Sequence, residues 1–437
     1  MNSSTPIEMI VTPAVGLVDD PLQIVLRGLT PNTAVTVSAR HLDARGGLWS
    51  SHGTYVADGA GFVDLAQAPP LCGTYCGADG EGLIRSLVID DDADRRPFDG
   101  IILDPIEIEF TAKVLGRRCI GTASTKRFYV ATNVKSREVH EHGLHGLLFT
   151  PRGCEVRPGV IVVGGSGGGL RFSAQVAALL ASHGFAGLAL AYFGLPNLPS
   201  HLVEIPLEYF AKASAWLIRQ DCVEAGGIGV MGISRGAELA LLLGSRLPMI
   251  CAVVEYCPSH TLWSGLGQDH PVDKSAWTEL GRALPFARLI APHLQSVSRH
   301  VFRKAPIALT PLFNAALDSS IPADAAIPVE RTNGPILLVS GEDDQMWPSS
   351  RMGELVMRRL ADSHHRHASR HCRYADAGHL IRPPGVSTAT LAGKFAFGGE
   401  GAAQAAANRA AWTETLAFLA SSLAGREKLD TVSSIGG

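Results

Sequence analysis

The sequence is poor in charge, in aromatic side chains and in long apolar runs. Charged residues make up 18% of the 437 residues, aromatic residues 6%, and the formal net charge is −3. This balance argues against a disordered chain, a nucleic-acid-coating protein or a protein of the membrane surface. No stretch reaches the roughly 18 apolar residues that a membrane-spanning helix requires. We therefore expect a small-molecule partner, with no nucleic acid bound and no membrane insertion.

The eight cysteines are too scattered over a long chain to form a disulfide framework. Cys72 and Cys76 have a CxxxC spacing, but no second Cys or His pair follows at the distance typical of a zinc site. The run HHRH at 364–367 follows a predicted surface helix, so we interpret it as solvated histidines. The first residues lack the basic segment and apolar run of a secretion signal. These observations predict a cytoplasmic protein with no metal site and no cofactor.

The chain is longer than a single hydrophobic core usually organises, and its two halves have different periodicities. In residues 1–131, short strand patterns alternate with turns. Apolar and polar residues alternate through IEIEFTAKV at 106–114, which indicates a half-buried strand. About seven such segments, LIRSLVI at 83–89 among them, predict an antiparallel β-sandwich. Residues 132–143 are predicted to be a linker.

Residues 144–437 alternate between continuous apolar runs and helical patterns. The runs GVIVVGG, AGLALAY, IGVMGIS, AVVEYCP and PILLVSG are typical of strands that are covered on both faces. Helical segments between them predict a mostly parallel sheet with helices on both sides. Residues 258–333 interrupt the alternation, and an insertion of this length is usually functional, as in a lid.

Two serines lie in a G-x-S-x-G pattern, Ser166 and Ser234. Ser234 follows an apolar strand and directly precedes a helix, which is the setting of a nucleophile on a sharp strand-to-helix turn. The alternative at Ser234 is a purely structural turn. Ser166 is followed by three glycines, and so glycine-rich a loop holds a side chain poorly. Such a loop suits the presentation of backbone N–H groups to an oxyanion.

A nucleophilic serine needs a histidine base and a carboxylate that orients the base. On a sheet of this type the three follow in the chain order serine, acid, histidine. Asp343 and Asp344 come after the strand PILLVSG, and His379 lies in a loop after the next predicted strand. All three groups would then meet at one edge of the sheet. We favour Asp344 as the acid, because Asp343 directly follows the strand end and is better placed to cap it or to face solvent.

Over nearly its full length the sequence resembles the family of acyl-CoA thioesterases and bile acid-CoA:amino acid N-acyltransferases. The resemblance is carried, in order, by LRGLTPNTAVTVSARHLDARGGLW, GGGLRFSAQVAALLASHGFAGLALAYFGLPNLP, IPLEYFAKASAWL, GVMGISRGAELAL, IPVERTNGPILLVSGEDDQMWPS and AGHLIRPP. It implies a β-sandwich followed by an α/β-hydrolase domain, with a triad at Ser234, Asp344 and His379. It also implies that an acyl chain passes from coenzyme A to the nucleophile, and then to water or to an amine.

The nucleophile itself bears on the choice between hydrolysis and transfer. In the family that the sequence resembles, dedicated amino-acid conjugating enzymes typically carry a cysteine, so Ser234 favours hydrolysis. Arg235 stands where relatives often have lysine. Its backbone N–H would stabilise the oxyanion, together with those of Ser166 and Gly167, so the change of side chain is expected to matter little.

Coenzyme A carries several phosphates, and the small net charge means that any basic docking site must be local. Arg299, His300, Arg303 and Lys304 in the insertion are candidates for it, and the alternative is a solvated helix face. The leading hypothesis is an acyl-CoA hydrolase. The alternatives are an acyltransferase with the same triad, an ester or carbon–carbon bond hydrolase, and a non-catalytic binding protein.

Overall fold

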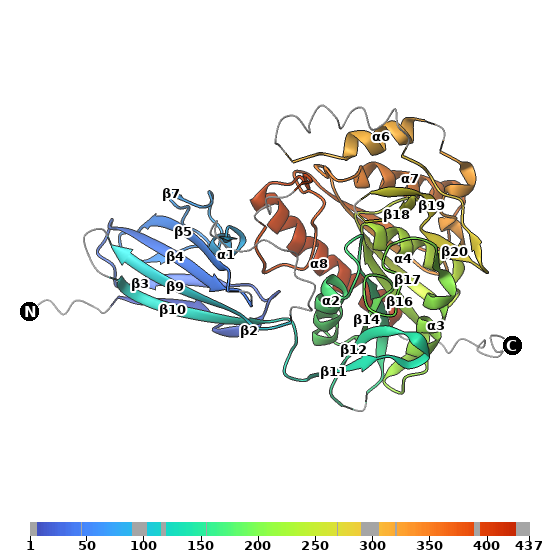
Figure 1. Ribbon diagram of the computed structural model, residues 1–437. Helices are drawn as coiled ribbons and strands as arrows, with labels where there is room; N and C mark the ends of the chain where they lie inside the picture. The colour runs from blue at the N-terminus through green and yellow to red at the C-terminus, as the bar shows by residue number, and fades with distance from the viewer. Residues whose placement is uncertain are drawn as a thin grey trace, which may run out of the picture. The chain divides into compact units, whose positions relative to one another are not determined.

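The computed structural model describes residues 7–44, 46–89, 103–114, 119–153, 155–268, 270–289, 306–319, 321–388 and 394–424. These residues form two compact units (Figure 1). The first contains the described residues within 1–98, 103–129 and 383–391, and the second contains those within 130–382 and 392–437. The boundary near residue 130 lies close to the predicted one. The return of 383–391 to the first unit was not anticipated from the sequence.

The first unit is a β-sandwich, as its alternating strand patterns predicted. Its elements are β1 (Glu8–Thr12), β2 (Val15–Leu17), β3 (Gln23–Arg27), β4 (Ala34–Leu42), β5 (Leu48–Val56), β6 (Val63–Asp64), β7 (Cys72–Gly73), α1 (Gly82–Arg85), β8 (Val88–Ile89), β9 (Ile106–Val114) and β10 (Cys119–Phe128). One sheet has the order β1-β3-β6, and the other has the order β2-β10-β9-β4-β5-β7, with β8 paired to β5. Residues from both sheets, such as Ile24 and Phe110, share one buried core. Strand pairing is antiparallel except between β2 and β10.

The prediction of a strand over 83–89 is wrong for its first half. Residues Gly82–Arg85 form the short helix α1, and only Val88–Ile89 pair as a strand. The Ser51 hydroxyl donates to the Leu83 carbonyl, and the Arg85 side chain forms an ion pair with Asp79. These side-chain contacts, the first of them with a residue 32 positions away along the chain, override the local strand propensity.

The second unit is built around one eight-stranded sheet. Its strands are β11 (Val134–Val139), β12 (His145–Pro151), β13 (Arg157–Val163), β14 (Ala186–Ala191), β16 (Val223–Ile233), β17 (Ile250–Tyr256), β22 (Ile336–Gly341) and β23 (Arg370–Tyr374), in the order β11-β12-β14-β13-β16-β17-β22-β23. Pairing is antiparallel from β11 to β14 and parallel from β14 onward. Every residue of β14, β17 and β22 is buried, as expected for strands covered on both faces.

Helices cover both faces of this sheet (Figure 1). The helices are α2 (Arg171–Ser182), α3 (Leu207–Ile218), α4 (Arg235–Arg246), α7 (Ser349–Asp362) and α8 (Gly401–Leu423). Side chains of α3, α4 and α7 share one core with Val230 of the central strand β16. On the opposite face of that strand, Leu419 and Leu423 of α8 lie against Gly229, where a Cβ would approach them to 3.2 Å. No helix in the described part of the chain is both long and apolar enough to span a lipid bilayer.

Residues 132–143 are not a linker, in contrast to the prediction. Val134–Val139 form β11, the edge strand of the large sheet, and Glu141–Gly143 form a single 3₁₀ turn. The strand buries only its two end valines, and the four residues between them are polar and exposed. The apolar pattern that identifies a strand is therefore missing from the sequence at this edge.

The predicted insertion, 258–333, runs from the end of β17 to the start of β22, two strands that pair directly. Its described residues add no strand to the eight-stranded sheet. They form short elements: β18 (Ser264–Leu266), β19 (Pro271–Ser275), β20 (Trp277–Glu279), β21 (Arg282–Ala283), α6 (Thr310–Asp318) and two 3₁₀ turns. β20 also pairs with β15 (Ile205–Pro206), ahead of α3.

Candidate active site

Ser234 lies at the turn between β16 and α4. Its backbone angles are φ 56° and ψ −121°, a conformation that residues other than glycine rarely adopt. Hydrogen bonds hold it on both sides: Ser234 N donates to Tyr256 O at 2.8 Å, and Ala237 N and Glu238 N donate to Ser234 O. This strained strand-to-helix turn, on a sheet covered by helices, has the backbone geometry that a nucleophile elbow of the α/β-hydrolase fold requires.

Close packing explains the two glycines of the motif around Ser234. A Cβ on Gly232 would lie 2.0 Å from the carbonyl oxygen of Gly236, and a Cβ on Gly236 would lie 2.3 Å from that of Gly164. Both distances are too short for any side chain. The strand, the helix and the glycine-rich loop therefore approach one another closely only because these positions carry no Cβ.

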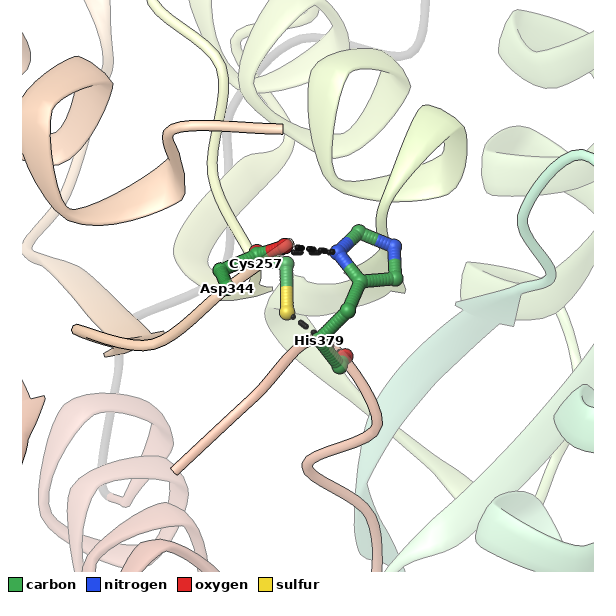
Figure 2. Close-up of side chains that lie close together, drawn as sticks. All are labelled: Cys257, Asp344 and His379. Carbon is green, nitrogen blue, oxygen red and sulfur yellow. Dashed lines mark hydrogen bonds and ion pairs between the residues drawn. The ribbon is translucent and has the colours of Figure 1, made fainter. Parts of the chain in front are cut away.

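Asp344 and His379 form a buried pair, as predicted (Figure 2). His379 Nδ1 lies 2.9 Å from Asp344 Oδ2 and 3.1 Å from Oδ1, and the two residues are 4% and 5% exposed. The same carboxylate accepts hydrogen bonds from the Ser349 hydroxyl at 2.6 Å and from the amides of Met346 and Trp347. A carboxylate oxygen at this distance is placed to accept a hydrogen bond from Nδ1–H of His379, and in that tautomer Nε2 is the acceptor.

Asp343, the alternative acid, has different partners. Its side chain is exposed and accepts hydrogen bonds from the Gly399 amide at 2.8 Å and from Gln345 Nε2 at 3.1 Å. No contact joins Asp343 to His379 within the described residues. The preference for Asp344 over Asp343 therefore agrees with the observed geometry.

Cys257, which the sequence analysis overlooked, ties the histidine loop to the serine turn. Its thiol donates to the His379 carbonyl (Figure 2). The preceding residue, Tyr256, accepts the hydrogen bond from Ser234 N. Burial and the negative charge of Asp344 raise the pKa of the Cys257 thiol well above its ordinary value. The strand AVVEYCP ends at the same sheet edge as the triad candidates, and this was the signal for Cys257 in the sequence.

The glycine-rich loop after β13 borders the serine turn. A Cβ on Gly165 would lie 3.4 Å from the Ser234 Cβ. Ser166 and Gly167 are exposed, and within the described residues their amides donate no hydrogen bond to the protein. The amide of Arg235, the first residue of α4, is one of the helix-start donors that lack an intrahelical acceptor. The three predicted oxyanion donors thus lie on the two segments that flank Ser234.

The sequence matches known protein families in both halves of the chain. Residues 205–425 match the family description "BAAT / Acyl-CoA thioester hydrolase C terminal", and residues 19–141 match "Acyl-CoA thioester hydrolase/BAAT N-terminal region". The chain belongs to the acyl-CoA thioester hydrolase/BAAT family of enzymes. It is 32% identical to acyl-coenzyme A amino acid N-acyltransferase 1 of Mus musculus, over 94% of this chain and 97% of that protein.

A second relative of this family member is the peroxisomal succinyl-coenzyme A thioesterase of Mus musculus, 32% identical over 84% of this chain and 83% of that one. Among solved structures, a putative dienelactone hydrolase from Klebsiella pneumoniae matches with a TM-score of 0.41 and 14% identity, over 66% of this chain and 98% of that one. Relatives named as thioesterases and as N-acyltransferases are thus equally similar to the chain. Identity alone does not select between the two activities.

In this family member the Arg235 side chain makes buried contacts that the sequence analysis did not predict. It is buried, pairs with Glu238 at 3.2 Å and donates to the Trp263 carbonyl at 3.1 Å. Glu238 in turn accepts hydrogen bonds from Trp277 Nε1 at 2.7 Å and from Trp263 N. Both tryptophans belong to the insertion. Arg235 and Glu238 therefore anchor the insertion to the first turn of α4, next to Ser234.

Glu255 lies on β17, the strand that pairs with β16, and is a second buried carboxyl group in addition to Glu238. It pairs in register with Gly232, and neither of its carboxyl oxygens has a hydrogen-bond partner among the described residues. Burial, reinforced by the charge of Glu238, raises the pKa of Glu255 well above its ordinary value. Burial also raises the pKa of Glu238 to about 7, although the Arg235 charge acts in the opposite direction.

Glu255 is therefore expected to make stability depend on pH. Between the ordinary pKa of 4.5 and the raised pKa of the folded state, the folded protein keeps the proton of Glu255 and the unfolded chain releases it. Within that window folding must restore the proton, so the stability contribution falls as pH rises, by about 1.4 kcal/mol per pH unit. Glu255→Gln cannot ionise, so its melting temperature should exceed that of the wild type by more at pH 8 than at pH 5. An equal difference at both pH values in calorimetric scans would show that Glu255 does not change its protonation on folding.

Arg299, His300, Arg303 and Lys304, the predicted phosphate contacts, lie outside the described residues. The Cys72 and Cys76 thiols are both free and exposed, and HHRH at 364–367 lies beyond the end of α7. Within the described chain, the three metal-ligating side chains that do come together are Cys257, Asp344 and His379.

Proposed function

We propose that the chain hydrolyses acyl-CoA or a closely related acyl thioester through an acyl-enzyme on Ser234. His379 acts as the general base, and Asp344 orients it. The observation that carries the proposal is the buried Asp344–His379 pair at the sheet edge where the strained Ser234 turn lies. The thioesterases among the relatives supply the substrate class. The substrate enters as a reactant, and the chemistry uses no cofactor.

The reaction begins when His379 Nε2 takes the proton of the Ser234 hydroxyl as its oxygen attacks the thioester carbonyl. The negative charge that develops on the carbonyl oxygen is stabilised by the backbone N–H of Arg235, together with that of Ser166 or Gly167. The tetrahedral intermediate expels coenzyme A as the thiol, with the proton supplied by the His379 imidazolium. Water, deprotonated by the same histidine, then attacks the ester, and the free acid leaves with Ser234 regenerated.

The fixed carboxylate contributes to each proton transfer. The amides of Met346 and Trp347 donate to Asp344 Oδ1, and the Ser349 hydroxyl donates to Oδ2, so the carboxylate keeps Oδ2 directed at His379 Nδ1 throughout the cycle. An imidazolium formed next to this buried negative charge is stabilised relative to one in an apolar site. Ordered donors of this kind need no reorganisation as the charge appears.

Serine chemistry favours water over an amine as the second acceptor. The acyl-enzyme on Ser234 is an oxygen ester, which is intrinsically less reactive toward amines than the thioester that a cysteine would form. Water is present at about 55 M, and it is the acceptor unless a site binds the amine and excludes water. An N-acyltransferase with the same triad is the second candidate, because relatives with that name are as similar to the chain as the thioesterases.

The product distribution tests this choice. With a panel of acyl-CoA chain lengths and millimolar glycine or taurine, we expect free acid as the dominant product and release of one CoA per turnover. Ser234→Cys should shift the distribution toward amide while slowing hydrolysis, because a thioester acyl-enzyme reacts more readily with amines. Mass spectrometry of the products across an amine series measures both effects. A wild-type enzyme that yields mainly amide would overturn hydrolysis in favour of transfer.

The docking site for coenzyme A is proposed from the charge of the insertion and from its anchoring next to Ser234. Arg299, Arg303 and Lys304 are the basic residues of the insertion that we assign to its phosphates, because an insertion anchored next to Ser234 would border the bound substrate.

A parallel assay with oxygen esters in the same panel separates a thioesterase from a general ester hydrolase. The cytoplasmic location stays a prediction.

A further inference from the structure

We propose that Cys257, Asp344 and His379 form a binding site for a thiophilic divalent cation, Zn²⁺, and that its binding inhibits the enzyme. The inhibitory part of this inference rests on the proposed function, because it requires His379 to act as the base. The binding part rests only on the three side chains. The cation acts as an inhibitor. It replaces the hydrogen bond between Asp344 and His379 that the metal-free site contains, and it takes no part in the reaction.

Three potential ligand atoms of different kinds converge at this point. The Cys257 thiol, one Asp344 carboxylate oxygen and one His379 ring nitrogen all lie within 4.8 Å of one another. They belong to the segments that follow β17, β22 and β23, and Figure 2 shows the three side chains close together. Ligand atoms around one tetrahedral zinc lie about 3.3–3.7 Å apart, given bonds of about 2.0–2.3 Å. Shifts on the order of an ångström therefore convert the observed cluster into a three-ligand site.

Charge balance favours the cation over an empty buried cluster. Without a metal, the site holds the negative charge of Asp344, a neutral imidazole and a neutral thiol, all of them less than a tenth exposed. Binding of Zn²⁺ displaces the Cys257 thiol proton to solvent, and the ion then sits between one thiolate and one carboxylate. The net charge of the three ligands and the ion then becomes zero, and the Asp344 carboxylate keeps its hydrogen bonds from Ser349 and from the amides of Met346 and Trp347. Thiolate together with imidazole is a donor set that zinc favours over magnesium or calcium.

The surrounding hydrogen bonds keep the ligands in place. Ser349 and the amides of Met346 and Trp347 fix the carboxylate, and such bonds to a ligand are what orient it in known metal sites. The fourth coordination position would be open to water or to a substrate atom. Cys257 is what distinguishes this arrangement from an ordinary acid–histidine pair, since the other two ligands are common to any such triad.

Inhibition follows from which nitrogen the metal takes. Zinc on Nδ1 occupies the lone pair of that nitrogen and moves the imidazole proton to Nε2. Nε2 then carries a hydrogen and accepts no proton from Ser234, so the acyl-enzyme does not form. The ion also replaces Asp344 as the partner of His379. A chain with zinc bound at this site should therefore not hydrolyse the substrate.

The test uses the full-length protein, stripped with a chelator and titrated with Zn²⁺. Calorimetry measures binding without reference to activity. Hydrolysis is followed with a p-nitrophenyl ester, because free coenzyme A would itself bind zinc through its thiol. We expect one zinc per chain, inhibition with the same concentration dependence, and full recovery of activity with chelator. Cys257→Ser should weaken binding at least about 10-fold, and its inhibition, normalised to its own metal-free rate, should weaken in parallel.

Two controls match this variant. Cys251→Ser removes another buried thiol from the same strand, and the double variant Cys72→Ser, Cys76→Ser removes the exposed pair; both should bind zinc as the wild type does. If Cys257→Ser fails to fold, Co²⁺ bound to the wild type should show thiolate-to-metal charge-transfer absorption, and a cobalt complex without it overturns the site.

Failure of this inference is distinguishable from failure of the proposed function. Ser234→Ala, which the proposed function makes inactive, should still bind zinc with wild-type affinity. Equal zinc affinity in the wild type and a folded Cys257→Ser variant would overturn the site. Zinc binding that depends on Cys257 but leaves hydrolysis unchanged would overturn the inhibition, whereas the proposed function is tested without zinc by the kinetics of Ser234→Ala and Asp344→Asn.

Discussion

Ser234→Ala is expected to lower kcat for acyl-CoA hydrolysis by about 10⁶, the scale seen when a nucleophile is removed from a working triad. The alanine has no oxygen to carry the acyl group, so only the oxyanion donors and substrate binding remain. Alanine adopts the same strained backbone at φ 56° with the same cost as serine, so the fold should be unaffected. Steady-state kinetics together with thermal unfolding separate the loss of chemistry from a loss of structure.

Ser166→Ala is the matched control, because Ser166 lies in the other G-x-S-x-G sequence. Its side chain is exposed and its proposed role is confined to the backbone N–H, which alanine keeps. We expect most of the activity to remain. A large loss in Ser166→Ala, combined with substantial activity in Ser234→Ala, would move the nucleophile to the glycine-rich loop.

Asp344→Asn is expected to lower kcat on the order of 10⁴-fold while leaving the binding of substrate largely unchanged. The asparagine amide would donate to His379 Nδ1, which selects the imidazole tautomer with its proton on Nε2. In that tautomer the histidine does not accept the proton of Ser234. Measurement of kcat and KM separately shows whether the loss lies in chemistry, as a wrong tautomer requires.

Asp343→Asn tests the assignment of the acid. Asp343 accepts hydrogen bonds from Gly399 N and Gln345 Nε2, both far weaker constraints on chemistry than the contact with His379. A modest effect is expected, below 10-fold by the energy of an ordinary exposed hydrogen bond, about 1 kcal/mol. If both variants are folded and Asp343→Asn is the more damaging, the acid has been assigned one residue out of register.

Much of the fold was readable because its signals are local. Continuous apolar runs identify β14, β17 and β22, since strands covered on both faces have no polar side. The edge strand β11 escaped notice because only its two end valines are buried. The short helix α1 escaped because side-chain contacts hold it in place, one with the distant Ser51 and one with the nearby Asp79. Edge and tertiary effects of this kind leave no periodic pattern in the sequence.

The site was predictable to the extent that strand ends meet at one edge of a parallel sheet. That rule brought Asp344 and His379 together, and the observed pair agrees with it. It did not reveal the side-chain partners, because hydrogen bonds such as that from Cys257 to the His379 carbonyl depend on loop geometry. The contacts of the Arg235 side chain were not predicted for the same reason: its partner Trp263 lies in the insertion, whose path no sequence pattern gives.

The acyl-enzyme is the central intermediate of this account, and its direct observation is the sharpest test. The protein is mixed with a slowly hydrolysed acyl-CoA, quenched with acid within one turnover, digested and examined by mass spectrometry. The account predicts the mass of the acyl group on the peptide that contains Ser234, one equivalent per chain, absent from Ser234→Ala and lost on longer incubation as free acid appears. Acyl mass on any other residue, or turnover with no acylated peptide at any quench time, would contradict it.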